Sequence, residues 1–288
     1  MEIVLAVNEW FRANQRDLPW RRPGFTAWGT LVSEVMLQQT PVARVIPRLE
    51  DWLIRWPTPA DLAAAPVGDA VRAWGRLGYP RRALNLHACA AAITEHHGGV
   101  VPESVEELLA LPGVGDYTAR AVAVFAYGHR HPVVDSNVRR VLARAIDGQA
   151  EASPPSTRRD LAAMAAVLPD DLAEARLASA AIMELGALVC TARSPRCAAC
   201  PIAHICTWRA AGYPPYAGRP SPVQKKYEGS DREVRGLMMA QLRASDTPVR
   251  PGDLERLWPD TTQRARALAS LMADGLAVGS PESGYRLP

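Results

Sequence analysis

The stretch that decides the fold is Leu111-Pro-Gly-Val-Gly-Asp-Tyr-Thr-Ala119, which lies between two segments with helical periodicity. Gly113 and Gly115 allow the backbone to turn sharply and to come close to another group. The helix that follows begins with free N–H groups, which suit a phosphate oxygen. A plain helix–helix turn is the alternative. The full pattern, with Val114 between the two glycines, favours a helix-hairpin-helix that grips one DNA strand without reading its sequence.

Helical patterns extend from this hairpin in both directions. Thr58-Pro59-Ala60-Asp61 has the residues of a helix start, with an N-cap, a proline and an acidic third residue. Ser104 and Glu107 have the spacing of a capping box just before the hairpin. No convincing strand pattern precedes Cys206, so the sequence predicts a mainly α fold.

The chain divides into three regions. Residues 1–210 are predicted to form one helical region that carries a cysteine-rich loop at 190–206. Residues 211–230 are rich in proline and glycine, which predicts an extended linker. Residues 231–288 predict three helices and a small hairpin, the arrangement of a winged-helix-like domain. Such domains bind DNA or dock proteins, and the pattern alone favours neither use.

Composition and charge are those of an ordinary globular protein. The chain has 288 residues, of which 48% are hydrophobic and 22% are charged, with a formal net charge of +3. That charge permits a nucleic-acid partner without proving one, and the pairs Arg81-Arg82 and Arg139-Arg140 are interpreted as ordinary solvated pairs. We expect no membrane association and a cytoplasmic location, because no signal peptide or spanning segment is present.

Four of the five cysteines fall in one short segment with the spacing C-x6-C-x2-C-x5-C: Cys190, Cys197, Cys200 and Cys206. Packed cysteines in a reducing cytosol indicate a metal or cluster rather than disulfides. Four thiolates can hold a 4Fe-4S cluster or zinc. Zinc sites usually have two short Cys-x-x-Cys pairs and this segment has one, which favours the 4Fe-4S cluster.

Several motifs together resemble a known family. The hairpin, then Val134-Asp135-Ser-Asn137-Val-Arg-Arg-Val-Leu142, then the cysteine segment are similar to the helix-hairpin-helix DNA glycosylases of the endonuclease III superfamily. Ser33-Glu34-Val-Met-Leu-Gln-Gln-Thr40 narrows the resemblance to the adenine DNA glycosylases, the MutY family. The resemblance covers about residues 1–210. It implies a six-helix domain plus an iron–sulfur helical domain, and a partner in double-stranded DNA with a mismatch or an 8-oxoguanine lesion.

Two carboxylates are the candidate catalytic groups, and the resemblance assigns their roles. Glu34 lies among apolar neighbours, where desolvation raises a carboxyl pKa and allows it to protonate N7 of adenine. Asp135 precedes a helix, where its ordinary role is an N-cap, and it is expected to hold a negative charge beside C1′ of the sugar. Asn137 is expected to support this aspartate, and Ser136 stands where glycine is usual.

Related enzymes that also cleave the DNA strand carry a lysine just after the hairpin, whose amine forms a Schiff base with the sugar. Tyr117 occupies that position here. A tyrosine cannot form an imine. We therefore expect a monofunctional enzyme, which removes the base by water without efficient strand cleavage.

The resemblance also indicates residues that open the duplex and line the base pocket. Base flipping leaves a hole that side chains must fill. Gln39 and Tyr79 are expected to enter the helix around the mismatch, and Arg21 and Trp28 to line the pocket. The remaining expected DNA contacts are Leu37, Gln38 and Thr40, beside the hairpin residues Gly113, Val114 and Gly115.

The chain departs from the family pattern in three places. Ala180 stands where a Glu or Gln normally contacts the adenine, and Pro80 and Leu84 replace a usual tyrosine and arginine. The family's C-terminal domain, which senses 8-oxoguanine, is replaced by the linker and the winged-helix-like tail. A short tail of this kind is similar to that of some actinobacterial members. We expect the tail to contact DNA near the opposite base.

The first interpretation is a base excision repair enzyme, acting as a monomer, that removes adenine opposite 8-oxoguanine or guanine. A thymine glycosylase for T:G mismatches is the close alternative, because it also has tyrosine after the hairpin. A non-catalytic, structure-specific DNA binder with an iron–sulfur cluster is the third. Glu34 together with Asp135 argues against it, since a pure binder has no need of them.

Overall fold

The computed structural model describes residues 2–218 and 226–288, so the part of the predicted linker at 219–225 lies outside the described residues. The described chain is helical apart from two short strands in the tail, which confirms the mainly α fold. It forms two compact units that do not follow chain order, and each is described by itself. Unit 1 comprises Met1–Thr30, Glu103–Leu109 and Gly115–Pro220, and unit 2 comprises Leu31–Pro102, Ala110–Val114 and Ser221–Pro288.

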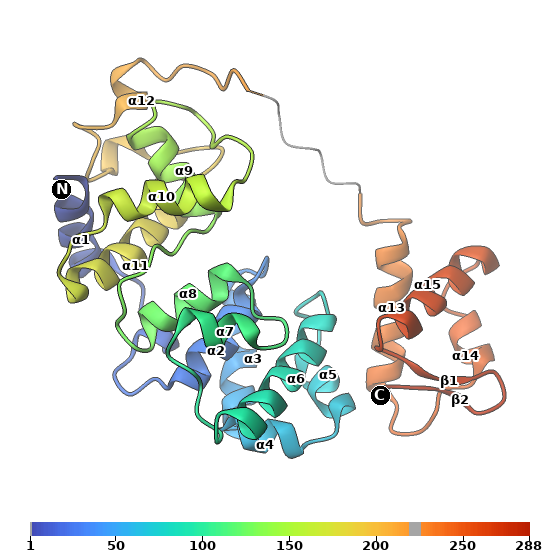
Figure 1. Ribbon diagram of the computed structural model, residues 1–288. Helices are drawn as coiled ribbons and strands as arrows, with labels where there is room; N and C mark the ends of the chain where they lie inside the picture. The colour runs from blue at the N-terminus through green and yellow to red at the C-terminus, as the bar shows by residue number, and fades with distance from the viewer. Residues whose placement is uncertain (1, 219–225) are drawn as a thin grey trace. The chain divides into compact units, whose positions relative to one another are not determined.

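Unit 1 is built around the long helix α11. This helix packs against both α1 and α9, and α9 in turn contacts α10 and α12 (Figure 1). Its core consists of small and branched apolar side chains such as Val7, Val138 and Ile182, all fully buried. Its helices are α1 (Glu2–Asn14), α8 (Asp116–Phe125), α9 (Ser136–Ala145), α10 (Thr157–Val167), α11 (Leu172–Leu188), α12 (Thr207–Ala210) and most of α7 (Val105–Ala110), with the 3-10 turns Pro19–Arg21 and Cys197–Ala199.

The helical part of unit 2 has a core rich in tryptophan. Trp52 makes edge-to-face contacts with Trp56 and Trp74, at ring-centroid distances of 4.6 and 5.8 Å. The expected capping box at Thr58 and Asp61 is confirmed at the start of α4. The helices are the greater part of α2 (Ala27–Leu37), α3 (Val42–Arg55), α4 (Pro59–Ala64), α5 (Val67–Trp74) and α6 (Arg81–His96).

The predicted hairpin connects α7 to α8, and its two glycines have different roles. Gly113 has a φ of +74°, and a Cβ there would lie 2.5 Å from Cβ of Asn85 on α6. Only glycine fits this turn and this close approach. Gly115 has a φ of −101°, and a Cβ there would meet nothing within 4 Å. The expected sharp turn and close approach therefore occur at Gly113, whereas Gly115 has ordinary extended backbone and open space beside it.

The tail contains three helices and a two-stranded sheet. The helices are α13 (Asp231–Ala244), α14 (Pro251–Glu255) and α15 (Thr261–Ala273). Strands β1 (Val278–Ser280) and β2 (Gly284–Arg286) pair antiparallel with Gly279 opposite Tyr285, and Val249 forms an isolated bridge to Tyr285. Gly275 ends α15 with a φ of +70°.

None of the helices among the described residues combines the length and apolar character needed to span a bilayer.

Candidate active site

Glu34 lies in the last two turns of α2 and is only 6% exposed. Its helix is apolar on most sides, with Leu31, Val32 and Val35 all buried. A carboxyl group is rarely buried to this degree unless it has a specific task or partner. The expected desolvation of this side chain is therefore present in unit 2.

Asp135 is the N-cap of α9 in unit 1. Its carboxylate accepts a hydrogen bond of 2.7 Å from the backbone N–H of Val138 and another of 2.7 Å from the side-chain amide of Asn137. These two bonds fix both carboxylate oxygens. The cap expected from the sequence and the expected support by Asn137 therefore occur together.

Burial raises the pKa of Asp135 above its ordinary value, and this effect outweighs the hydrogen bonds from Val138 and Asn137, which lower it. The positive charge of Arg140 acts in the same direction as those bonds. Each donor therefore opposes protonation of a half-buried carboxylate.

Arg140 links this aspartate to the cysteine segment. Its guanidinium donates to Oδ1 of Asn137 at 2.7 Å, to the carbonyl of Gly186 at 2.8 Å and to the carbonyl of Cys190 at 2.7 Å. A Cβ on Gly186 would lie 2.7 Å from Cβ of Asn137, so α11 approaches α9 at a distance that only glycine allows. The position of Asn137 thus depends on Arg140 and on this close helix contact.

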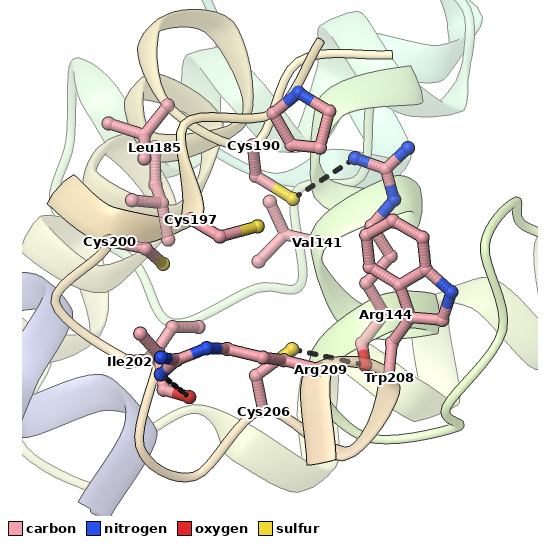
Figure 2. A pocket seen from close by; sticks show the side chains of 14 residues that line it. Val141, Arg144, Leu185, Cys190, Cys197, Cys200, Ile202, Cys206, Trp208 and Arg209 are labelled. Carbon is pink, nitrogen blue, oxygen red and sulfur yellow. Dashed lines mark hydrogen bonds between the residues drawn. The ribbon is translucent and has the colours of Figure 1, made fainter. Parts of the chain in front are cut away.

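The four cysteines of the predicted cluster site line one open hollow in unit 1, with about 390 Å³ of empty space. Figure 2 shows their sulfur atoms arranged around this space and pointing into it. The rest of the wall is largely apolar and includes Val141, Leu185 and Ile202. All four are free cysteines, so the donor set and its apolar surroundings fit an iron–sulfur cluster.

Arg144 braces the loop that carries these cysteines. Its buried guanidinium donates to the sulfur of Cys190 at 3.5 Å (Figure 2). It also donates to the carbonyls of Thr191 and Ala192 at 2.7 and 3.0 Å. It also lies over the ring of Trp208, 4.7 Å from the centroid. Hydrogen bonds to a sulfur ligand and cationic surroundings tune iron–sulfur clusters, so Arg144 belongs to the surroundings of this site.

Arg21 is held by a buried carboxylate. Glu184, 2% exposed, accepts hydrogen bonds of 3.0 Å from both terminal nitrogens of Arg21 and bonds of 2.8 and 2.6 Å from the side chain of Arg16. Burial would raise the pKa of Glu184, but the hydrogen bonds from Arg16 and Arg21 outweigh it and lower the pKa to about 2. Glu184 is therefore ionised, and the position of Arg21 is fixed.

The buried guanidinium of Arg82 connects the end of α2 to the turn before α6. It is hydrogen-bonded to both segments at once. It donates to the carbonyl of Gln38 at 2.7 Å and the hydroxyl of Thr40 at 3.0 Å after α2, and to the carbonyl of Gly78 at 3.1 Å before α6. It also donates to the carbonyls of Val35 and Met36 at 2.7 and 3.0 Å. Burial lowers the pKa of Arg82 to about 10, which leaves it charged at neutral pH.

These two segments carry the side chains expected to open the duplex. Gln39 and Tyr79 both have left-handed backbone, with φ of 54° and 48°, although neither is glycine. Such conformations cost of order 1–3 kcal/mol and persist where surrounding structure enforces them. Both side chains are exposed, Tyr79 by 51%. Gln39 and Tyr79 are therefore two exposed side chains on strained turns, and Arg82 is hydrogen-bonded to the backbone of both turns.

The remaining predicted residues are distributed over both units. In unit 1, Trp28 is buried and Tyr117 packs partly buried against Ala121 and Val124. In unit 2, Leu37 and Gln38 are half-buried, and Thr40 and Val114 are buried. Gln38, Val114 and Gly113 line a hollow of about 270 Å³ with Arg82 and Asn85. Glu34 belongs to unit 2 and Asp135 to unit 1.

The interpretation of the arginine pairs as solvated is wrong for Arg82 and for both members of the pair Arg139-Arg140. Arg82 is buried, and Arg139 and Arg140 are both half-buried, with Arg139 paired to Asp160 at 2.8 Å. Arg81 alone of the four is well exposed, by 64% of its side chain. Adjacent residues on a helix point about 100° apart, which separates exposed Arg81 from buried Arg82. Helical position was the available signal for Arg82.

Two family models match the chain. The model described as "HhH-GPD superfamily base excision DNA repair protein" matches residues 32–166, which include Glu34, the hairpin and Asp135. The description "Iron-sulfur binding domain of endonuclease III" matches residues 190–206, the segment that lines the cysteine hollow. The expected iron–sulfur site is thereby confirmed.

Solved structures agree with the fold. The structure of a thermostable thymine-DNA glycosylase has a TM-score of 0.65 at 25% identity, covering 72% of this chain and 95% of that one. An endonuclease III–DNA complex has a TM-score of 0.62 at 24% identity and covers 73% of this chain and 94% of that one. These similarities confirm the helix-hairpin-helix glycosylase fold.

Curated relatives extend the similarity into the tail. An adenine DNA glycosylase of Mycobacterium tuberculosis is 54% identical over 280 residues, which is 97% of this chain and 91% of the relative. One of Mycolicibacterium smegmatis is 53% identical over 96% of this chain and 93% of the relative. The adenine DNA glycosylase of Homo sapiens is 41% identical over 69% of this chain and 38% of the relative. With its buried glutamate, its capped aspartate and its cysteine hollow in the matched segments, the chain belongs to the adenine DNA glycosylases.

Proposed function

We propose that this enzyme excises adenine mispaired with 8-oxoguanine or guanine by hydrolysing the N-glycosidic bond in double-stranded DNA. The observation that carries the proposal is the pair of carboxylates, in a chain of this family. Glu34 is buried in an apolar helix, and Asp135 is fixed by two hydrogen bonds of 2.7 Å. A DNA-binding protein without catalytic activity needs neither.

Each carboxylate has the surroundings that its proposed role requires. The departing base needs a proton, and the buried carboxyl of Glu34 is the group proposed to deliver it. The sugar develops positive charge as the bond breaks, and Asp135, held by Asn137 and Val138, supplies a fixed negative charge. Glu34 then takes a proton from the attacking water.

Water is the proposed nucleophile because the position after the hairpin is Tyr117 rather than lysine. Its phenol cannot form an imine with the opened sugar. The product is therefore an intact strand with an abasic site. Treatment with borohydride during turnover is expected to trap no covalent protein–DNA adduct.

The iron–sulfur cluster is proposed to be of the 4Fe-4S type, held by Cys190, Cys197, Cys200 and Cys206. When bound, it joins four thiolates of one loop and so fixes the loop's shape. This chain's own residues then connect the loop to the catalytic aspartate through Arg140 and Asn137. No step of base removal requires the cluster to change oxidation state.

Thymine at T:G mismatches is the second candidate substrate. The observation in its favour is the structural match to a thymine-DNA glycosylase, supported by a relative described as a thymine/uracil-DNA glycosylase with 34% identity over 69% of this chain. The identity of 54% to adenine DNA glycosylases over nearly the whole chain favours adenine.

One assay separates these functions. Duplexes with A:8-oxoguanine, A:G and T:G pairs are incubated with the enzyme, and abasic sites are then cleaved with alkali. We expect product from the first two duplexes and none from T:G. Product from T:G alone would replace adenine by thymine as the substrate, and no product from any duplex would leave only DNA binding. We further propose that the enzyme acts on chromosomal DNA in the cytoplasm and that it acts as a monomer. Sedimentation of the enzyme with and without a duplex tests the monomeric state.

A further inference from the structure

The tail packs on α5 and α6 within unit 2. A Cβ on Gly68 of α5 would lie 2.5 Å from the backbone oxygen of Pro288, so the chain end rests directly on this helix. Arg72 of α5 donates to the carbonyl of Ser245 at 3.2 Å and to the carbonyl of Arg243. Arg81 of α6 forms an ion pair of 3.3 Å with Asp274. Three separate contacts therefore hold the tail on one side of α5 and α6.

This packing brings an arginine of the tail to the turn that follows α5. Arg76 lies in this turn, three residues before Tyr79, and the guanidinium of Arg44 on α3 donates to its carbonyl. Arg48 of α3 lies beside the same turn, with Nε 3.5 Å from the position of a Cβ on Gly75. Arg72 donates to the backbone carbonyl of Arg243, near the end of α13, and so places this residue beside α5, where the charge of Arg76 lowers the pKa of Arg243. The arginine cluster thus consists of Arg44, Arg48, Arg72, Arg76 and Arg243.

Negative charge around the arginine cluster is sparse. Asp51 lies 3.7 Å from Arg48 and Asp246 lies 3.6 Å from Arg72, and their side chains are 73% and 96% exposed. In the described ranges, the guanidinium groups of Arg76 and Arg243 have neither a hydrogen-bond acceptor nor an ion-pair partner. Arg243 is half-buried. Burial lowers its pKa, and the positive charge of Arg76 lowers it further.

Two unpaired cations held together, one of them half-buried, are unfavourable unless an anion joins them. A guanidinium fork matches the geometry of a phosphate, which accepts two parallel hydrogen bonds. The cluster borders the turn whose exposed Tyr79 is proposed to enter DNA, so the DNA backbone is the polyanion best placed to meet it. An acidic protein surface is the competing partner, and nothing else in this part of the chain favours it.

We propose that Arg76 of the glycosylase region and Arg243 of the tail together bind the phosphate backbone of duplex DNA, so that the tail extends the DNA-binding surface beside Tyr79. The inference rests on the proposed DNA binding and does not depend on which base is excised. It gives the tail a definite role, because only the docked tail can supply Arg243 at this position.

The test uses the full-length protein with its cluster and a fluorescein-labelled duplex without a mismatch. Anisotropy titrations between about 50 and 300 mM KCl are compared for wild type, Arg76→Gln, Arg243→Gln and the double variant. Each single substitution is expected to weaken binding about five- to tenfold at 100 mM salt and to reduce the slope of log K against log salt by about one. Arg256→Gln is the control, because this tail arginine is exposed and pairs with Asp253.

A second variant tests the docked position of the tail without removing charge. Gly68→Val is expected to displace the tail from α5, while the sequence keeps all of its arginines. It is expected to lower the salt slope as Arg243→Gln does, and adding Arg243→Gln to it is expected to have little further effect. If Arg76→Gln and Arg243→Gln bind the duplex with wild-type affinity and slope, the proposal is wrong, and an acidic protein partner becomes the better interpretation. Base release from a saturated A:8-oxoguanine duplex tests the proposed function separately.

Discussion

The side-chain amide of Asn137 donates a hydrogen bond of 2.7 Å to the carboxylate of Asp135, and the oxygen of the same amide accepts one of 2.7 Å from Arg140. One amide therefore transmits the position of Arg140 to the proposed catalytic carboxylate. Since Arg140 also holds the carbonyl of Cys190, the geometry of the cysteine loop and that of the aspartate are coupled through three side chains.

The first prediction concerns the pH dependence of base release. Asp135 must be ionised, and its pKa is already raised by burial. Asn137→Ala removes a bond to the charged form, so the pKa of Asp135 should rise further. The acid limb of the single-turnover rate should then move to higher pH, while DNA binding changes little. Ser136→Ala, at the adjacent exposed position, serves as control, and an unmoved acid limb in Asn137→Ala would contradict the assigned role.

The second prediction concerns Gly186, where the contact between α11 and α9 leaves no room for a side chain. Gly186→Ala places a methyl group 2.7 Å from Cβ of Asn137 and must displace it. The rate of base release is expected to fall at least about tenfold, equivalent to about 1.4 kcal/mol of transition-state stabilisation. Ala187→Ser, one residue further and exposed, should leave the rate unchanged. Iron content and the absorbance near 400 nm distinguish this effect from loss of the cluster.

The two carboxylates themselves can be tested by isosteric amides. Glu34→Gln cannot deliver a proton and should abolish excision while it retains binding to an A:8-oxoguanine duplex. Asp135→Asn removes the fixed charge and should cost at least about 3 kcal/mol of transition-state stabilisation, as at other electrostatic sites. Glu174→Gln, a partly exposed carboxylate of unit 1, is the matched control. Near-normal single-turnover rates in either active-site variant would refute its role.

Arg82 is expected to act as a positioning residue for Gln39 and Tyr79. Arg82→Lys keeps the charge but cannot reach acceptors in both turns at once. Base release should slow at least about tenfold, and a 2-aminopurine reporter at the mismatch should show less unstacking when the protein binds. Arg55→Lys, at an exposed ion pair with Asp69, should match wild type in both measurements. Normal unstacking in Arg82→Lys would show that the two turns hold their shape without it.

The buried ion pair of Glu184 predicts an acid-dependent contribution to stability. Its pKa is about 2 in the folded state against an ordinary value of 4.5, so the folded state favours the ionised form. The stabilisation is complete above about pH 4.5 and is lost as the pH falls toward 2. Glu184→Gln should lower the free energy of unfolding by about 3 kcal/mol at pH 7, and the difference from wild type should shrink below pH 4.5. Urea unfolding at several pH values measures this, and a difference independent of pH would contradict it.

The sequence alone was sufficient where local chemistry dictates structure. The helix starts at Thr58 and Asp135 follow from N-cap residues, which satisfy backbone groups within the same turn. The turn at Gly113 follows from its backbone freedom, and the cysteine spacing identifies the cluster loop because all four ligands lie within 17 consecutive residues, 190–206. The burial of Glu34 was predicted from its apolar neighbours on one helix.

The tertiary structure decided which charged side chains are buried and what they hold. Glu184 meets Arg16 across 168 residues of sequence, and Arg82 reaches Gln38 across 44, so neither pairing has a local signal. Gly186 and Gly68 are unremarkable in sequence, and their need for glycine arises only where another helix or the chain end comes within 3 Å. A local pattern specifies what a residue can do, whereas the packing of distant helices determines which partner it meets, because desolvation leaves a buried charge stable only beside the groups that the fold brings to it.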